Sequence, residues 1–151
     1  MKMNKIVIFK IDNEEYAADI TEVERILGYT EPTKIPEAPS FVRGVIKYQD
    51  IILPIIDLKE RFHLSHNDKM NEAKIIVVKN ESKYIGLIVD MVSEVIDISS
   101  ENIDEAPDIV KSQINRYVSG MVKIGNRIII LLDTNKIVSM EEIIELNSIP
   151  Q

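Results

Sequence analysis

Two aspartates stand at corresponding points of this chain and are the first residues that could do chemistry together. Gly44 precedes Asp57 and Gly120 precedes Asp133 by the same number of positions. Two carboxylates that share a proton are the catalytic device of aspartic proteases. Such a dyad needs a small, flexible loop after each aspartate, but no glycine follows either one within two positions. We therefore expect each aspartate to cap a following helical turn, with a hydrolase using both as the alternative.

Two histidines, His63 and His66, have a spacing that suits a pair of metal ligands on a helix. The chain has no cysteine and no further histidine, so Glu60 or Asp68 would have to complete such a site. The five glycines lie far apart, which excludes a phosphate loop or a dinucleotide fingerprint. No arrangement of serine, histidine and aspartate supports a nucleophile. We expect no catalytic, cofactor-binding or metal-binding residue, and we interpret both histidines as exposed loop residues.

The elements that would position any site are duplicated. Glu37-Ala38-Pro39 recurs as Glu105-Ala106-Pro107, and Tyr16 recurs as Tyr84 at the same spacing. The two aspartate segments form a second matching pair at slightly wider spacing. A solenoid needs at least about three repeats, so two repeats indicate a tandem pair of small folds. Two similar folds side by side leave a cleft between them.

The size of the repeats predicts that they share a core. Half of 151 residues is close to the size at which a lone core is marginal, and 45% hydrophobic residues are ample for joint burial. We expect residues 5–64 and 73–146 to be two barrel repeats of one domain spanning residues 1–151, joined by a polar linker at 63–70. Strands could be exchanged between the repeats, because a sequence repeat does not fix which neighbour closes each sheet.

The charge of the chain restricts its partners. Eighteen basic and 25 acidic residues give a net charge of −7, which repels nucleic acid and anionic membranes. Only 5% of residues are aromatic and none is tryptophan, which disfavours base stacking. The lack of cysteine fits a reducing cytoplasm, and the apolar run at residues 1–10 is too short for a signal peptide core or a membrane span. We expect a soluble cytoplasmic protein that neither binds nucleic acid nor inserts into a membrane.

Short β-branched runs bounded by polar breaks predict an all-β fold. They lie at residues 6–11, 45–48, 51–56, 75–79, 84–89, 121–124 and 128–132. Hairpin turns are expected at Asn13-Glu14-Glu15, Gln49-Asp50, Asn80-Glu81-Ser82 and Gly125-Asn126. Residues 128–132 lack alternation, so both faces of that strand should be covered. In a small antiparallel fold this pattern indicates a closed barrel packed against a neighbour.

Helix is expected only in short pieces. Residues 20–27 place apolar side chains at helical spacing before Gly28, which predicts one or two helical turns. Ser139 and Glu142 form a capping-box signal for a short C-terminal helix. Three prolines make residues 30–40 an extended connector.

With catalysis disfavoured, the remaining chemistry is binding. Five apolar residues stand at short edges of the two expected barrels: Val23, Ile26, Leu27, Val92 and Val95. We expect four of them, Val23, Ile26, Val92 and Val95, to be the apolar contacts of a partner. Each could be plain core, where a fully buried side chain contributes roughly 1.5 to 3 kcal/mol. Exposed together, they would form a patch that marks an interaction site. We expect partners to bind in the groove between the barrels.

Several short sequence segments together are specific for a protein family through their order and spacing, although no one of them is specific alone. They are Tyr16-Ala17-Ala18-Asp19-Ile20, residues 23–26, Ile35-Pro36 to Pro39, Gly44-Val45-Ile46, residues 53–58, Arg61-Phe62, Gly86-Leu87-Ile88-Val89-Asp90, Ala106-Pro107, Gly120 and Ile130-Leu131-Leu132-Asp133. Over nearly its whole length the chain resembles the chemotaxis coupling proteins, CheW. The resemblance implies two five-stranded SH3-like barrels packed around a shared core, with no catalytic activity and no cofactor.

The resemblance also implies partners. A protein of this family would bridge transmembrane chemoreceptors and the histidine kinase CheA, whose regulatory domain has the same fold. The cytoplasmic tip of the receptor would lie in the groove between the barrels. The protein would then be cytoplasmic and associated with membrane receptor arrays through its partners. A diverged paralogue that serves another scaffold is the alternative within this fold.

The chain departs from the family pattern at one pair of positions. The family reads Asn-Leu-Arg-Gly where this chain has Lys47-Tyr48-Gln49-Asp50, and Val-x-Glu-Ile or Val-x-Glu-Val where it has Val23-Glu24-Arg25-Ile26. The Val92-Ser93-Glu94-Val95 segment keeps the pattern. The family's Arg and Glu positions are therefore Gln49 and Arg25 here. We expect Arg25, Lys47, Tyr48, Gln49 and Asp50 to contact partners beside the four valine and isoleucine positions.

Two consequences of this departure are open. If Arg25 and Gln49 are neighbours, a neutral amide to guanidinium bond replaces a stronger ion pair and holds the groove edge less firmly. Alternatively, the positive charge has moved between strands to meet a partner with a matching acid. Lys47 adds a further positive charge two residues from Gln49, which favours the second interpretation.

Overall fold

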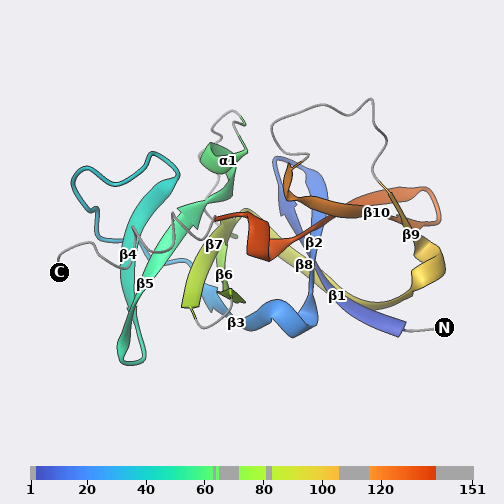
Figure 1. The fold of residues 1–151 in the computed structure, drawn as a ribbon, viewed down its shortest axis with the longest axis horizontal. Helices are drawn as coiled ribbons and strands as arrows, with labels where there is room; N and C mark the ends of the chain where they lie inside the picture. The colour runs from blue at the N-terminus through green and yellow to red at the C-terminus, as the bar shows by residue number, and fades with distance from the viewer. Residues whose placement is uncertain (1–2, 63, 65–71, 81–82, 106–115, 139–151) are drawn as a thin grey trace.

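The computed structural model describes residues 3–62, 64, 72–80, 83–105 and 116–138, and their regular structure is almost entirely β (Figure 1). The strands are β1 (Met3–Ile11), β2 (Glu14–Asp19), β3 (Val23–Gly28), β4 (Val42–Tyr48), β5 (Ile51–Asp57), β6 (Lys74–Asn80), β7 (Lys83–Val89), β8 (Met91–Ser99), β9 (Ile103–Asp104), β10 (Val118–Ile124) and β11 (Arg127–Leu132). The short helices are η1 (Ile20–Glu22), α1 (Leu58–Arg61), η2 (Ser100–Asn102) and η4 (Thr134–Lys136). In the described part of the chain, no helix has the length and apolar character needed to cross a membrane.

The strands form two curved sheets that lie side by side as barrels (Figure 1). The six-stranded barrel has the order β8-β1-β2-β11-β10-β9, and the five-stranded barrel has the order β3-β6-β7-β5-β4. The sixth strand, β9, contains only two residues, so both barrels have five main strands. Each barrel takes strands from both halves of the sequence. The sheets therefore do not coincide with residues 5–64 and 73–146, because the strand exchange that the repeat left open is present.

The two barrels follow the same plan. An antiparallel edge pair carries a register shift in both, β3 with β6 and β8 with β1. A parallel pair joins the halves in both, β5 with β7 and β11 with β2. Reading the registers together makes β3 equivalent to β8, β6 to β1, β7 to β2, β5 to β11 and β4 to β10. Paired positions on these five strands of one barrel therefore have counterparts in the other.

The registers correct one detail of the predicted repeat. Tyr16 lies opposite Phe9 in the β1–β2 pair, and Ile85 lies opposite Val78 at the equivalent place in the β6–β7 pair. Tyr16 therefore corresponds to Ile85, and the match to Tyr84 is wrong by one residue. In a strand this difference exchanges the faces: Tyr16 lies in the cluster between the barrels, whereas Tyr84 packs against the inside of its own barrel.

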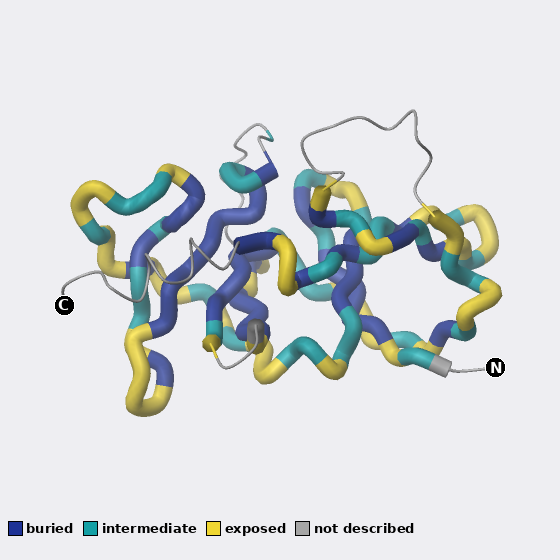
Figure 2. Tube along the Cα trace, viewed as in Figure 1, coloured by how far each residue is buried: buried dark blue, intermediate teal, exposed yellow. Residues whose placement is uncertain are grey.

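Three apolar clusters form the core, one inside each barrel and one between the barrels. Strand β6 serves two of them, because Ile75 and Val77 face into the five-stranded barrel while Ile76 and Val78 face the cluster between the barrels. These strand segments are buried along their length (Figure 2). A row of rings with centroids 6.2, 6.0 and 5.3 Å apart crosses the middle cluster, in the order Phe9, Tyr16, Phe62 and Tyr117. The predicted shared core is confirmed.

All seven predicted strands are present, but the predicted helix at residues 20–27 is wrong. Only η1 is helical there, and Val23 begins strand β3. Val23 and Ile26 lie opposite Val78 and Ile76, which both belong to the middle cluster. The register shift between Val23 and Arg25 inserts one extra residue. Two residues three positions apart therefore share a face of the strand, which imitates helical spacing.

The Gln49-Asp50 and Gly125-Asn126 turns and both aspartate caps agree with expectation. The predicted turn at Asn80-Glu81-Ser82 includes residues 81 and 82, which lie outside the described residues. The first hairpin turns at Asp12 and Asn13, with φ angles of 52° and 69°, one residue earlier than predicted. The Asp57 Oδ1 atom accepts from the Lys59 backbone N–H at 3.0 Å, and the Asp133 Oδ1 atom accepts from the Asn135 N–H at 3.0 Å. Both aspartates are therefore helix caps, as predicted. The expected C-terminal helix, and the linker apart from residue 64, lie outside the described residues.

Candidate partner-binding site

The valines predicted to bind partners lie on the two equivalent edge strands. Val23 is on β3 and Val92 is on β8, and both are partly buried against the cluster between the barrels. Val92 lies opposite Phe9 just as Val23 lies opposite Val78. The two side chains therefore occupy the same place in each barrel, at the borders of the shared core.

Ile26 and Val95 extend these borders into solvent. Ile26 is 39% exposed and Val95 is 48% exposed, which is high for such apolar side chains. Val95 lies opposite Val7 on β1. The structure thus gives each edge strand one half-buried and one exposed apolar residue. None of the four lines the two hollows described below.

Four other predicted residues come together in one hollow of about 710 Å³. Arg25 reaches it from β3, Lys47 and Tyr48 from β4, and Gln49 from the turn that follows. Strands β3 and β4 are the two edges of the five-stranded sheet, so the hollow lies where the barrel closes. Arg25 and Gln49 both line this hollow, and in that respect they are neighbours, as the sequence suggested. Asp50 is exposed in the turn but does not line the hollow.

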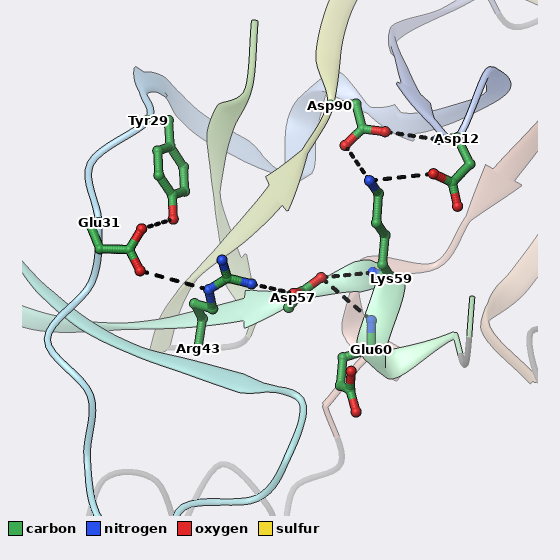
Figure 3. A network of polar contacts seen from close by, with 8 residues as sticks. All are labelled: Asp12, Tyr29, Glu31, Arg43, Asp57, Lys59, Glu60 and Asp90. Atoms are coloured by element: carbon green, nitrogen blue, oxygen red, sulfur yellow. Dashed lines mark hydrogen bonds and ion pairs between the residues drawn. The ribbon is translucent and has the colours of Figure 1, made fainter. Parts of the chain in front are cut away.

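A chain of polar contacts borders a second hollow of about 380 Å³ (Figure 3). The Tyr29 hydroxyl donates to Glu31 at 2.6 Å, and Glu31 lies 3.9 Å from the Arg43 guanidinium. Arg43 donates at 2.9 Å to the Asp57 carboxylate that caps α1. Burial, followed by the hydrogen bond to Glu31, raises the pKa of Tyr29 to about 12. Burial opposes a high pKa for Arg43, but Tyr29 and the two carboxylates raise it overall.

A buried lysine joins the two barrels (Figure 3). Lys59 on α1, which follows β5, is 7% exposed. Its Nζ atom lies 3.0 Å from Asp90, between β7 and β8, and 3.3 Å from Asp12 in the β1–β2 turn. The Asp12 N–H also donates to Asp90 at 2.8 Å. Burial opposes the charged lysine, but the two carboxylates more than offset it and raise its pKa. Sequence reasoning missed this contact, because it depends on the strand exchange.

One end of the six-stranded barrel is equivalent to the end of the other barrel that carries the hollow between β3 and β4. The charged residues at this equivalent end neutralise one another. Arg127 contacts Glu15 at 2.6 Å and Glu94 at 3.4 Å. The hydrogen bond with Arg127 lowers the pKa of Glu15 against the opposing effect of burial. Lys123 lies 2.7 Å from Asp104.

The candidate catalytic residues have structural partners. Asp57 is engaged by its cap and by Arg43, and Asp133 caps η4. Among the described residues, no hydrogen bond joins the two carboxylates, so a shared-proton dyad has no support. Within the same residues no three His, Cys, Asp or Glu side chains gather as a metal site. His63 and His66 lie outside the described residues.

Paired barrels with a shared core and apolar edge strands define a protein-binding module. The chain belongs to the CheW family: the CheW-like domain matches residues 5–142. It is 35% identical over 138 residues to the chemotaxis protein CheW of Klebsiella aerogenes, covering 91% of this chain and 83% of that protein. It is 29% identical over 137 residues to CheW of Bacillus subtilis, covering 91% and 88%. The crystal structure of the scaffolding protein TtCheW from Thermoanaerobacter tengcongensis superposes with a TM-score of 0.85 at 33% identity, covering 94% and 92%.

Proposed function

We propose that this chain is a non-enzymatic adaptor of chemotaxis signalling that couples chemoreceptors to a histidine kinase. Membership of the CheW family over residues 5–142 carries the proposal. Its relatives from Klebsiella aerogenes and Bacillus subtilis are chemotaxis proteins, and TtCheW, the similar protein of known crystal structure, is a scaffolding protein. A hydrolase is not favoured, because Asp57 and Asp133 are occupied as helix caps.

The two partners in this proposal are the cytoplasmic tip of a chemoreceptor and the regulatory domain of the kinase CheA. Two equivalent barrels packed on a shared apolar cluster offer two binding ends, which suits a bridge. The protein would lie in the cytoplasm and join receptor arrays through these partners. A diverged paralogue with another partner would differ only in what occupies the same surfaces.

Val23, Ile26, Val92 and Val95 are the proposed apolar contacts for the receptor tip. They border the shared core from both barrels, and Ile26 and Val95 are exposed in the free protein. A signalling encounter of this kind should bury about 1,200 Å² or less. Glu24→Lys beside these residues should change the association rate and its salt dependence more than the dissociation rate.

Binding of the full chain to a purified receptor tip and to the kinase regulatory domain tests the proposal by calorimetry. Val23→Asp combined with Val92→Asp should abolish measurable binding to the receptor tip, because charges would be buried in the contact. Ile128→Asp is the control for a charge placed on an exposed apolar side chain, since Ile128 is 66% exposed and belongs to β11, outside both edge strands. Wild-type affinity in the double variant would exclude these edges as the receptor site. No binding of the wild-type chain to either partner would argue against the adaptor itself.

A further inference from the structure

The hollow between β3 and β4 carries uncompensated positive charge. Arg25 and Lys47 line it, and its lining residues include no carboxylate. In the described part of the chain, neither cation has an ion pair. The acidic residues next to this site in sequence, Glu24 and Asp50, are exposed and do not line it. On a chain with a net charge of −7 this is a local excess of the opposite sign.

The other barrel shows what is missing beside Lys47. Lys123 is its counterpart on β10, and Asp104 on β9 neutralises Lys123 at 2.7 Å. Asp104 lies opposite Met121, and the counterpart of Met121 on β4 is Val45. Val45 forms its bridge with Thr33, with two backbone hydrogen bonds of 2.9 Å. Thr33 therefore occupies the place of the neutralising aspartate and offers no charge.

Arg25, the second cation of the hollow, occupies a position at which the other barrel has an acidic residue. Arg25 lies opposite Val77 after the register shift in β3, and Glu94 lies opposite Ile8 after the shift in β8. These two positions are equivalent. Glu94 contacts Arg127, and the charges at this end of the six-stranded barrel are therefore balanced by ion pairs within the chain. Among the described residues, Arg25 and Lys47 have no ion pair of this kind.

The backbone of Gln49 adds an independent sign of function. Its φ angle is 54°, in the left-handed region, and Gly125 at the equivalent turn has a φ angle of 57°. Glycine adopts this conformation freely, whereas glutamine is strained in it. Such strain is concentrated at functional sites. The glutamine side chain therefore stands in this turn at a cost to stability, and it lines the hollow.

We propose that this hollow binds an acidic peptide segment of a partner protein. Two carboxylates of the segment would pair with Arg25 and Lys47, and the Gln49 amide would donate a further hydrogen bond. Leu27, Ile46 and Tyr48 provide an apolar floor for side chains between the acids. The proposal rests on the adaptor function and specifies the chemistry of one docking segment. The hollow of about 710 Å³ is lined by only two cations, which suits a short acidic peptide better than a polyanion such as nucleic acid.

Peptide titration of the isotope-labelled full chain, followed by NMR, tests this proposal. The probes are a capped Leu-Glu-Glu-Leu-Glu-Glu peptide and its glutamine-substituted analogue. The acidic peptide should shift the amide signals of Arg25, Lys47 and Gln49 and leave those of Lys123 and Gly125 unchanged. The neutral analogue should shift none of them. Equal responses to both peptides, or equal responses at both barrel ends, would overturn the proposal.

Substitutions sharpen the test. Lys47→Gln and Arg25→Gln should each weaken acidic peptide binding about threefold, as expected for loss of one exposed ion pair. Lys123→Gln is the matched control and should have no effect. Thr33→Asp should weaken binding without loss of thermal stability, because it supplies the missing carboxylate within the chain. Unchanged affinity in Lys47→Gln, Arg25→Gln and Thr33→Asp would overturn the assignment.

Gln49→Gly separates strain from binding. It should raise the melting temperature, because glycine relieves the left-handed backbone, and it should weaken peptide binding. A lower melting temperature, or unchanged binding, would contradict the role given to Gln49.

Phosphatidylglycerol vesicles provide a further comparison: the same amide shifts at equal charge concentration would assign the hollow to anionic membranes instead. Failure of Val23→Asp with Val92→Asp to affect receptor binding would concern only the adaptor proposal, since neither residue lines the hollow.

Discussion

At the scale of residues, two glutamates should have opposite effects on the pH dependence of stability. Burial raises the pKa of Glu22 above its ordinary value, although the hydrogen bond from Thr134 opposes this. The hydrogen bond with Arg127 lowers the pKa of Glu15. The folded state therefore binds a proton at Glu22 more tightly than the unfolded chain does, and at Glu15 less tightly.

The sign of each effect follows from proton linkage. Ionisation of Glu22 lowers the free energy of unfolding as pH rises from its unfolded pKa through its folded pKa. Glu15 stabilises the fold above its unfolded pKa, and this contribution is lost as pH falls through its folded pKa. At pH 7, Glu22→Gln should raise the free energy of unfolding and Glu15→Gln should lower it. Urea unfolding between pH 3 and pH 7 measures both, and effects of the same sign at pH 7 would contradict this account.

The two capping aspartates should contribute to stability and not to turnover. Asp57→Asn and Asp133→Asn should each cost about 0.5 to 2 kcal/mol, the usual effect of a lost cap. The cost should be larger for Asp57, because it also accepts from Arg43. Chemical denaturation measures the loss. If the wild-type chain had peptidase activity and either substitution abolished it, the hydrolase alternative would be supported.

At the scale of elements, α1 should hold the barrels together through Lys59. Lys59→Met would leave the Asp12 and Asp90 carboxylates facing each other without their cation. Breaking a buried pair in this way costs about 3 to 5 kcal/mol, and we expect the lower end because the aspartate side chains are 24% and 20% exposed. Lys136→Met is the control, since its pair with Asp133 is exposed and 3.9 Å long. A cost for Lys59→Met no larger than that of the control would show that the barrels do not depend on this contact.

The elements also show where sequence reasoning succeeds. Runs of isoleucine and valine identify β5, β6 and β7 because most of their side chains are buried on both faces. The same kind of run identifies β11, but the expectation that both of its faces are covered is wrong at Ile128, which is 66% exposed. Strand β2 was missed because Ala17 and Ala18 carry no β-branched signal. Strands β3 and β8 were missed because an inserted residue in each breaks the alternation of faces.

At the scale of the whole molecule, the sheets explain why the site was only partly predictable. Arg25, Lys47, Tyr48 and Gln49 could be grouped from the resemblance to CheW, and the structure places them around one hollow. The contact of Lys59 with Asp12 and Asp90 could not be predicted. It requires knowing that β1 and β2 join the second half of the chain, and a sequence repeat contains no information about which copy supplies a strand.

The same exchange predicts that the halves do not fold apart. A fragment of residues 1–70 would contain β1–β5 but would lack β6 and β7 from one barrel and β8–β11 from the other. We expect each half alone to show poorly dispersed amide spectra and no cooperative thermal transition. Mixing the two fragments should restore both, because each supplies the strands that the other lacks. A cooperative transition in either isolated fragment would refute the shared core as the source of stability.

The most direct test of the adaptor account is whether the full chain bridges its two proposed partners. Membranes that carry a chemoreceptor are sedimented with the purified regulatory domain of CheA, with and without the chain. The account predicts that the kinase domain enters the pellet in proportion to added chain, and that Val23→Asp with Val92→Asp prevents this while Ile128→Asp does not. A kinase domain that stays in the supernatant at saturating chain, although the chain itself is folded, would contradict the account.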